Sequence, residues 1–233
     1  MKDQRLSGRQ LKTQILSLLH QDDLNQTLAL LERLPARQAV NPLFSFFFHT
    51  DEQVRWRAIV AMGAVVAHLA ENDPESARVV MRRLMWNLND ESGGIGWGSP
   101  EAMGEILARS PLLAVEFAHI LVSYIREDMN FIEHEGLQRG VLWGLARLAE
   151  TRPELVRSAG VYLVPYMKSP DPILRGLAAR TAAALDDAAA KAACARLAND
   201  PEKVRVFMNN RLVETTVAEL ATPPGKTKIS PEK

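Results

Sequence analysis

Two markers in this sequence recur with a common period of about forty residues. A small residue returns at intervals of 41, 40 and 39 positions, at Gly63, Gly104, Gly144 and Ala183. Upstream of it, a turn-forming residue returns at intervals of 39, 40 and 41 positions, at Asp51, Asp90, Asn130 and Asp171. Two independent markers with one period indicate a chain built from stacked copies of one supersecondary unit.

Each unit is predicted to be a pair of helices. After the turn marker, apolar residues recur at spacings of three and four, as between Val54 and Leu69. The other helix of a pair begins with a proline, whose missing N–H costs no intrahelical bond there; these prolines are Pro74, Pro111 and Pro153. The small marker residue lets neighbouring helices approach closely. Because we find no alternating β-branched run typical of a strand, we expect essentially no sheet.

Three segments place an aspartate, an aliphatic residue and then an arginine in the same order, and they contain Arg55, Arg175 and Arg205. The pattern resembles the HEAT-like repeat family, whose second helix carries an aspartate, then Val-Arg, then spaced alanines. The resemblance covers residues 36–220 and implies an all-α fold, an α-α superhelix of about five helix pairs. It also implies that Asp51 and Arg55 stabilise successive turns. It says little about chemistry, because such solenoids serve as scaffolds, adaptors, transport factors and a few enzymes.

The two ends differ from the repeats. Residues 1–35 contain two amphipathic helical patterns, near Gln10–Gln21 and Leu24–Leu34, and are predicted to cap the stack. Residues 221–233 contain three prolines, a glycine and three lysines with almost nothing to bury, so we expect a disordered tail.

Charge and cysteine content make some functional classes less probable for this chain and exclude others. The 28 basic residues balance 28 acidic ones, which disfavours a general binder of nucleic acid or anionic membranes. The single cysteine, Cys194, excludes an internal disulfide and a cysteine-based zinc cage. The N-terminus lacks the pattern of a secretory signal, and the apolar run 112–125 is too short and too polar to span a membrane. These features predict a cytoplasmic protein.

Two middle repeats depart from the pattern in the same way. Where other repeats carry Arg55 and Arg175, these carry Gly96 and Gly136, and the loop before the small marker is two residues longer. Residues 90–101 hold four of the thirteen glycines, and we expect Ser99 to cap a helix that begins at Pro100. Losing two long side chains from adjacent repeats would leave a recess. Because both repeats differ from the repeat pattern in the same way, we expect these residues to have a function other than stacking the repeats.

These two loops supply the candidate binding residues. We expect them to form one central groove lined by Glu91, Trp97, Glu101, Glu133, His134, Glu135 and Arg139. Carboxylates beside a tryptophan suit a protein partner, such as its Arg or Lys side chain, or a small polar or cationic ligand. A solvated acidic loop and a divalent-cation site are the alternatives. We assign no catalytic residue, no metal ligand and no cofactor.

The predicted function is a non-enzymatic binding or scaffold module of undetermined oligomeric state. The sequence contains no Gly-x-Ser-x-Gly or His-Glu-x-x-His motif. The HEAT-like resemblance leaves two alternatives, an enzyme similar to DNA alkylation-repair glycosylases and a lyase-like maturation accessory protein. Nucleic acid is disfavoured because the central loops are acidic and phosphate contacts need clustered cations. Four arginines would have to converge to supply them: Arg82, Arg83, Arg139 and Arg147.

Overall fold

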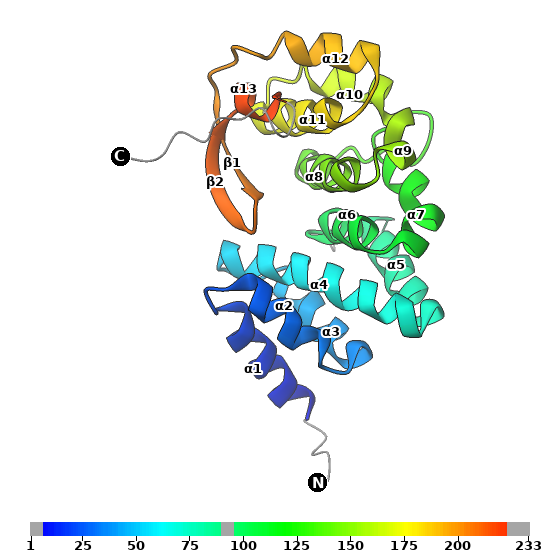
Figure 1. Cartoon of the computed structure of the whole chain (residues 1–233), viewed down its shortest axis with the longest axis vertical. Coiled ribbons are helices and arrows are strands. Elements are labelled where there is room, and N and C mark those ends of the chain that lie inside the picture. The colour runs from blue at the N-terminus through cyan, green and yellow to red at the C-terminus, as the bar shows by residue number, and fades with distance from the viewer. Residues whose placement is uncertain (1–6, 90–95, 223–233) are drawn as a thin grey trace. The chain divides into compact units, whose positions relative to one another are not determined.

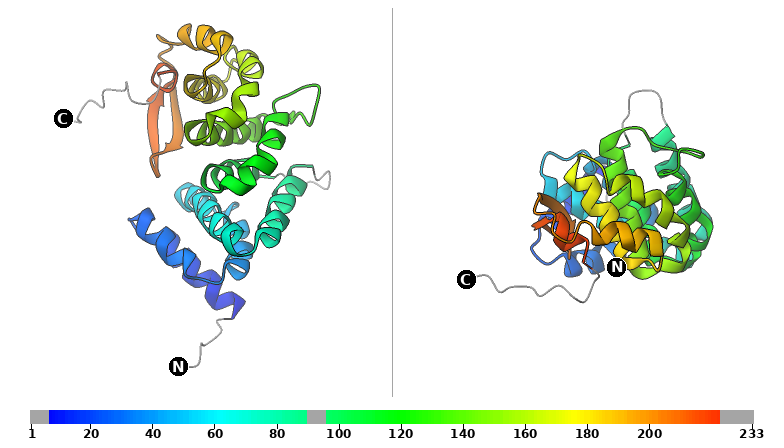
Figure 2. Two further views of the ribbon diagram at one scale, coloured as in Figure 1. Left: turned by 45° about the vertical axis from the view of Figure 1, so that its right-hand side comes forward. Right: turned by 90° about the horizontal axis from the view of Figure 1, so that it is seen from above.

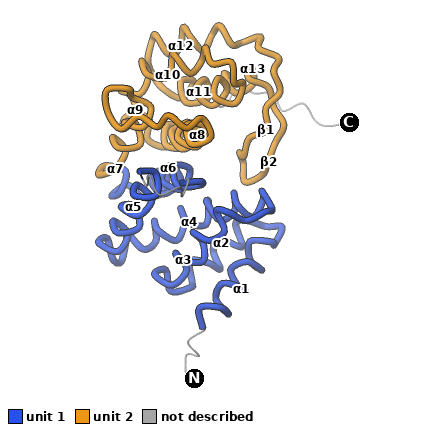
Figure 3. The backbone as a smooth tube through the Cα atoms, turned by 180° about the vertical axis from the view of Figure 1, so that it is seen from behind, with its two compact units in different colours: residues 1–114 blue, residues 115–233 orange. Residues whose placement is uncertain are grey.

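The structure is a computed structural model that describes residues 7–89 and 96–222. The chain divides into two compact units, Met1–Ala114 and Val115–Lys233, shown in two colours in Figure 3. We call them unit 1 and unit 2 and describe each by itself. In both, helices dominate the described residues (Figure 1), which confirms the predicted all-α repeat fold.

Unit 1 is formed by α1 (Gly8–Leu19), α2 (Leu24–Glu32), α3 (Ala36–Phe46), α4 (Glu52–Asn72), α5 (Pro74–Asn89), α6 (Ser99–Arg109) and the start of α7 (Pro111–Ser123). Consecutive helices α3, α4, α5 and α6 pack on one another, and α4 also packs on α6. Prolines begin α5 and α7 as predicted. Asp51 caps α4, since its Oδ1 accepts a hydrogen bond from the Gln53 N–H at 2.8 Å.

The small marker residue explains the close packing of α4 on α6. A Cβ atom on Gly63 would lie 2.4 Å from Cγ of Glu105 and 3.2 Å from its backbone carbonyl carbon. Even an alanine would therefore force the two helices apart. Glu105 is itself buried and forms an ion pair with Arg109 at 2.8 Å.

The two N-terminal helices form as predicted and are tied to α4 by one arginine. Arg57 donates hydrogen bonds to the carbonyls of Leu19 at 3.0 Å, of Asp22 at 3.1 Å and of Gln21. All three carbonyls lie where α1 ends and the chain turns towards α2. A buried guanidinium therefore satisfies the carbonyls at the end of α1 that lack helical partners.

Unit 2 contains the rest of α7, α8 (Glu135–Thr151), α9 (Pro153–Val156), a 3₁₀ turn (Arg157–Ala159), α10 (Gly160–Tyr166), α11 (Pro172–Ala184), α12 (Ala188–Ala195), β1 (Lys203–Met208), β2 (Arg211–Thr216) and α13 (Val217–Leu220). The second helices of neighbouring repeats, α8 and α11, pack together. Proline again begins α9.

Arginine and aspartate connect one repeat of unit 2 to the next. Arg139 bonds Asp171 at 2.7 Å, and Arg175 bonds Asp200 at 3.0 Å. Arg175 therefore bonds the aspartate that follows in the chain and not Asp171, the aspartate of its own turn. Asp171 uses its other oxygen to cap α11 through the Ile173 N–H at 2.9 Å, so each aspartate is free to receive the arginine of the preceding repeat.

The expectation of essentially no sheet was wrong, as was the assignment of Arg205 to a repeat helix. Residues 203–216 form an antiparallel hairpin in which Arg205 lies opposite Glu214, beside α11 (Figures 1 and 2). Exposed and buried side chains alternate over Lys203–Val206, the period of a strand. Asn209 and Asn210 at the turn have positive φ angles of 52° and 64°, which a tight hairpin turn needs and asparagine tolerates.

The hairpin is fastened to the repeat core by a tryptophan. Trp143 on α8 is buried, and its Nε1 donates a 2.7 Å hydrogen bond to the carbonyl of Phe207 on β1. Val204, Val206 and Phe207 are buried as well. The strand pair therefore covers α8 and α11 at the position where another helix was expected.

Candidate functional site

The glycine-rich loop of unit 1 leads into α6 through a left-handed residue. Gly98 has a φ of 76°, and a Cβ there would lie 2.9 Å from the ring of Phe47. Gly98, and not Ser99, is the N-cap, because α6 begins at Ser99. The predicted serine cap was therefore one residue late, and the Ser99 hydroxyl is instead buried, with no hydrogen-bond partner within residues 7–89 and 96–222.

No room is left for a side chain at Gly96, where a recess was predicted. A Cβ on this residue would lie 2.7 Å from the carbonyl oxygen of Asn87, at the end of α5. The glycine therefore lets the loop backbone contact the preceding helix, and the space that an arginine would need is filled.

Two of the three candidate residues in this loop can be placed. Glu91 lies outside the described residues. Trp97 is 40% exposed, which leaves part of its ring open to a partner. Glu101 stands in the first turn of α6, where its Oε2 is buried and has no hydrogen-bond partner among the residues that the structure describes. Burial raises the pKa of Glu101 to about 7, since a charged carboxylate there loses its hydration.

The raised pKa of Glu101 predicts a pH dependence of stability. The folded protein holds this proton up to about pH 7, whereas in the unfolded chain the pKa of the same carboxyl returns to its ordinary value of 4.5. Between these values the folded state binds more protons, so stability falls as pH rises, by up to about 1.4 kcal/mol per pH unit. Glu101→Gln should remove this slope in urea unfolding at pH 5, 6 and 7. An identical slope in the variant would show that the carboxyl is ionised throughout.

The second candidate loop, in unit 2, is occupied by structural contacts. His134 is the N-cap of α8, and its Nδ1 accepts a hydrogen bond from the Gly136 N–H at 3.1 Å. Arg139 bonds Asp171 and thus takes over, three positions later, the role expected of an arginine at Gly136. The inference that this repeat lacks its arginine was therefore wrong. Glu133 and Glu135 are both exposed.

The two loops belong to different units, Trp97 and Glu101 to unit 1 and the 133–139 segment to unit 2. The groove that they were expected to share therefore stays a prediction. Within unit 2, however, Glu135 lines a cavity of about 490 Å³. Its walls come from the α7–α8 connection, the start of α8, α10 and the start of α11.

The cavity combines aromatic walls with acidic side chains. Phe131, Tyr162 and Tyr166 contribute rings, and Glu127, Asp128 and Glu135 contribute carboxylates. Arg126 neutralises Asp128 through two hydrogen bonds, at 2.6 and 3.1 Å, and its guanidinium lies 4.7 Å from the centre of the Tyr162 ring. These hydrogen bonds lower the pKa of Asp128.

Two carboxylates at the cavity remain without a counter-charge. Neither Glu127 nor Glu135 is paired with a cation among residues 7–89 and 96–222. Both are exposed, so the negative charge lies at the solvent side of the cavity. The arrangement attracts a cation, which would meet carboxylates first and aromatic faces next.

A buried hydroxyl adds one more polar group. The Tyr166 hydroxyl oxygen has no hydrogen-bond partner in the described part of the chain. Burial, and to a smaller extent the charge of Glu127, raises the pKa of Tyr166 to about 12, so the hydroxyl stays protonated at neutral pH. It can therefore donate to or accept from a ligand group that enters the cavity.

Sequence reasoning missed Glu127, Tyr162 and Tyr166. The two tyrosines are four positions apart on one helix, which puts them on the same face, and this spacing is visible in the sequence. Nothing local, however, connects that face with the turn that carries Glu127. Comparison of the repeats singles out positions whose residue differs from one repeat to the next. Tyr162 and Tyr166 stand at neither of the two marker positions, so this comparison does not identify them.

The alternatives of a nucleic-acid surface and a metal site gain no support. Arg82, Arg139 and Arg147 are bonded to Glu75, Asp171 and Glu150 at 2.5, 2.7 and 3.0 Å. Such pairing removes the excess positive charge that phosphate contacts require. Among the described residues, no cluster of three or more His, Cys, Asp or Glu side chains is placed to hold a metal. In that same part of the chain, no helix combines the length and apolarity needed to cross a membrane.

Comparison with known proteins gives a sequence relative and several similar folds. No family model matches the chain. An uncharacterized protein of Archaeoglobus fulgidus is 32% identical over 108 residues, which are 46% of this chain and 52% of that protein. The chain thus spans about half the length of this relative.

Solved structures of repeat proteins cover most of the chain at low identity. A designed armadillo repeat protein is 17% identical, with a TM-score of 0.49 over 89% of this chain and 95% of its own. Another, solved in complex with the peptide (KR)4, is 18% identical, with a TM-score of 0.47 over 81% and 92%. An archaeal HEAT-like repeats protein from Thermococcus onnurineus NA1 is 16% identical, with a TM-score of 0.35 over 94% and 79%.

The assignment of the fold rests on the molecule itself. Helix pairs recur with the forty-residue period, the second helices of neighbouring repeats pack together, and arginine–aspartate bonds connect successive repeats of unit 2. By its fold, the chain is an α-helical repeat protein.

Proposed function

We propose that the protein is a non-enzymatic binding module whose unit 2 cavity receives a lysine or arginine side chain of a protein partner. The HEAT-like repeat fold suggests a binding or scaffold role. The observation that carries the proposal is the pair of carboxylates without counter-charge, Glu127 and Glu135, beside the rings of Tyr162 and Tyr166. The single thiol, Cys194, is buried and unpaired, which suits a reducing cytoplasm.

The two parts of a cationic side chain match two parts of the cavity. The methylene stem of lysine or arginine packs well on aromatic and aliphatic surface, which Phe131, Tyr162 and Val161 provide. Its charged end then lies near Glu127 and Glu135. The guanidinium of Arg126 already lies over the Tyr162 ring and would repel a second cation there. The charged end of the partner's side chain is therefore expected near Tyr166.

A protein partner is favoured over a free metal ion. A divalent cation needs several oxygen ligands converging at 2–2.6 Å, and no such cluster exists among the described residues. A flexible side chain, in contrast, can reach separate carboxylates and also use the rings. Since the carboxylates are exposed, the attraction should weaken as salt is added.

The proposal predicts that single charge removals at the cavity weaken binding. The probe is a fluorescein-labelled glycine-serine nonapeptide with one central lysine or arginine, measured by fluorescence anisotropy at low salt. Glu127→Gln and Glu135→Gln should each raise the Kd about threefold to tenfold, because each removes a charge-assisted contact.

Glu133→Gln is the matched control, since Glu133 is exposed two residues from Glu135 but does not line the cavity. It removes the same charge and should leave the Kd unchanged. Equal weakening by all three substitutions would indicate only general attraction to an acidic surface. Unchanged binding in both cavity variants would rule the cavity out as the site.

A further inference from the structure

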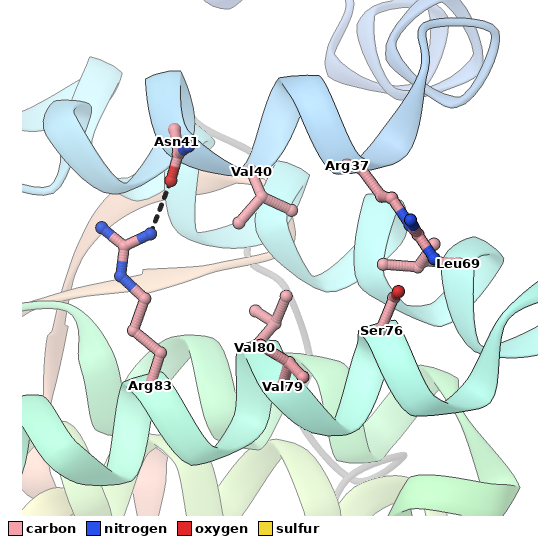
Figure 4. A pocket seen from close by; sticks show the side chains of 8 residues that line it. All are labelled: Arg37, Val40, Asn41, Leu69, Ser76, Val79, Val80 and Arg83. Atoms are coloured by element: carbon pink, nitrogen blue, oxygen red, sulfur yellow. Dashed lines mark hydrogen bonds between the residues drawn. The ribbon is translucent and has the colours of Figure 1, made fainter.

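A second cavity lies in unit 1, between α3 and α5 (Figure 4). It has a volume of about 250 Å³ and an apolar middle formed by Val40, Val79 and Val80. Figure 4 shows arginines at its two ends, Arg37 from α3 and Arg83 from α5. The cavity therefore has an apolar centre between two arginines, whereas carboxylates line the cavity of unit 2.

Arg83 is held in a fixed position without a carboxylate partner. Its Nη1 donates a 2.6 Å hydrogen bond to Oδ1 of Asn41, and its guanidinium lies 4.0 Å from the centre of the Phe44 ring. Neither partner carries a charge, and no carboxylate in the described part of the chain pairs with it. Arg37, by contrast, forms an ion pair with Asp73. The unneutralised charge is thus concentrated at the Arg83 end.

Apolar side chains flank Arg83 along the outer face of α5. Val79 is four residues before it and Trp86 three residues after it, so the three lie on one side of the helix. Val79 is 54% exposed and Trp86 is 72% exposed. A tryptophan and an arginine next to one another on an open surface are the residue types that contribute most to binding energy at protein interfaces.

We propose that this surface, formed by Val40, Val79, Val80, Arg83 and Trp86, docks an acidic amphipathic helix of a protein partner. One carboxylate of the helix pairs with Arg83 through its remaining N–H groups. Leucine-like side chains on either side of that carboxylate cover Trp86 and fill the space between Val40 and Val79.

Charge complementarity selects an acidic protein segment over nucleic acid. Phosphate backbones are held by several free cations in a row. Here Arg37 and Arg82 are already bonded to Asp73 and Glu75, and the two residues that flank Arg83 on the exposed face of α5, Val79 and Trp86, are apolar. One free positive charge between two apolar contacts fits one carboxylate between two apolar side chains.

The test is an NMR titration of the ¹⁵N-labelled full-length protein with a synthetic helical peptide. The peptide carries leucines three and four positions apart around a single glutamate, and a matched peptide carries glutamine instead. We expect saturable shifts of the Trp86 indole N–H and the Arg83 Nε–H signals. The glutamine peptide should bind about fivefold or more weakly, because it loses a charge-assisted pair.

Arg83→Gln should weaken the binding of the glutamate peptide by a similar factor. It should also abolish the preference of the protein for the glutamate peptide over the glutamine peptide. Trp86→Ala, at a position that is 72% exposed, should weaken the binding of both peptides. Arg33→Gln, an exposed arginine at the end of α2, is the charge-matched control and should change neither. The unit 2 variants Glu127→Gln and Glu135→Gln should also leave this binding intact, which separates it from the proposed cation site.

No saturable shift at Trp86 with either peptide would overturn the inference. So would shifts that do not depend on the charge of the peptide, or that persist in both Arg83→Gln and Trp86→Ala. Equal weakening by Arg33→Gln would show attraction to the net charge of the unit and would also overturn it.

Discussion

Trp143→Ala is expected to lower the free energy of unfolding by about 3–5 kcal/mol, the largest effect of any substitution considered. The indole is 2% exposed, so its removal leaves a cavity in the core of unit 2. It also leaves the carbonyl of Phe207 without its 2.7 Å donor and detaches β1 from α8. Urea unfolding followed by circular dichroism measures the loss.

Two comparison variants separate the contributions of Trp143. Trp143→Phe keeps most of the buried ring and loses the hydrogen bond, and should cost about 1–3 kcal/mol. Trp86→Ala removes the same side chain from an exposed site and should change stability by less than about 0.5 kcal/mol. A Trp143→Ala variant as stable as Trp86→Ala would contradict the described attachment of the hairpin.

Arg57→Met is expected to destabilise the protein by about 3 kcal/mol. The methionine fills part of the volume but donates no hydrogen bond, so the buried carbonyl of Leu19 and those of Gln21 and Asp22 lose their partner. Amide hydrogen exchange should show the loss first in α1 and α2, because Arg57 connects them to α4.

Arg55→Met is the matched control for Arg57. Arg55 donates one hydrogen bond, to the carbonyl of His49 at 3.2 Å, and is only partly buried. Its replacement should cost less than about 1 kcal/mol. Equal losses for the two variants, or unchanged exchange in α1 and α2 of Arg57→Met, would show that the arginine does not fasten these helices.

The helices of this fold follow from local signals. Proline at a first helical position marked α5, α7 and α9, and three- and four-residue spacing marked α4 and α11. Gly63 has its predicted role, because α4 and α6 pack too closely there for a larger residue. Helix starts and helix spacing depend on residues that are close together in the sequence, and they can therefore be predicted from the sequence.

The hairpin was missed although its signals are local too. Residues 203–206 alternate in polarity, and Asn209-Asn210 suits a tight turn, but the apparent repeat match at Arg205 favoured a helix. The sheet forms because Trp143 and α11 offer a surface that covers its apolar side. That surface comes from earlier parts of the chain, and Trp143 stands 64 positions before its hydrogen-bond partner Phe207.

The candidate sites depended still more on tertiary structure. Of the predicted binding residues that the structure describes, Glu135 lines the unit 2 cavity, whereas His134 and Arg139 hold the backbone and a neighbouring repeat. Tyr162 and Tyr166 reach the same cavity from the next repeat. A sequence comparison that searches for departures from a repeat finds unusual loops, but it cannot show which ordinary side chains converge beside them.

Direct recognition of a cationic side chain by the carboxylates of the unit 2 cavity should be detectable in a double-mutant cycle between protein and peptide. The cycle combines Glu135→Gln in the protein with lysine→norleucine in the peptide probe, and the four Kd values give the coupling energy between the two groups. We expect a coupling energy of about 1 kcal/mol or more, since either change alone should remove the same interaction. Additive effects within about 0.5 kcal/mol would contradict direct recognition at this cavity.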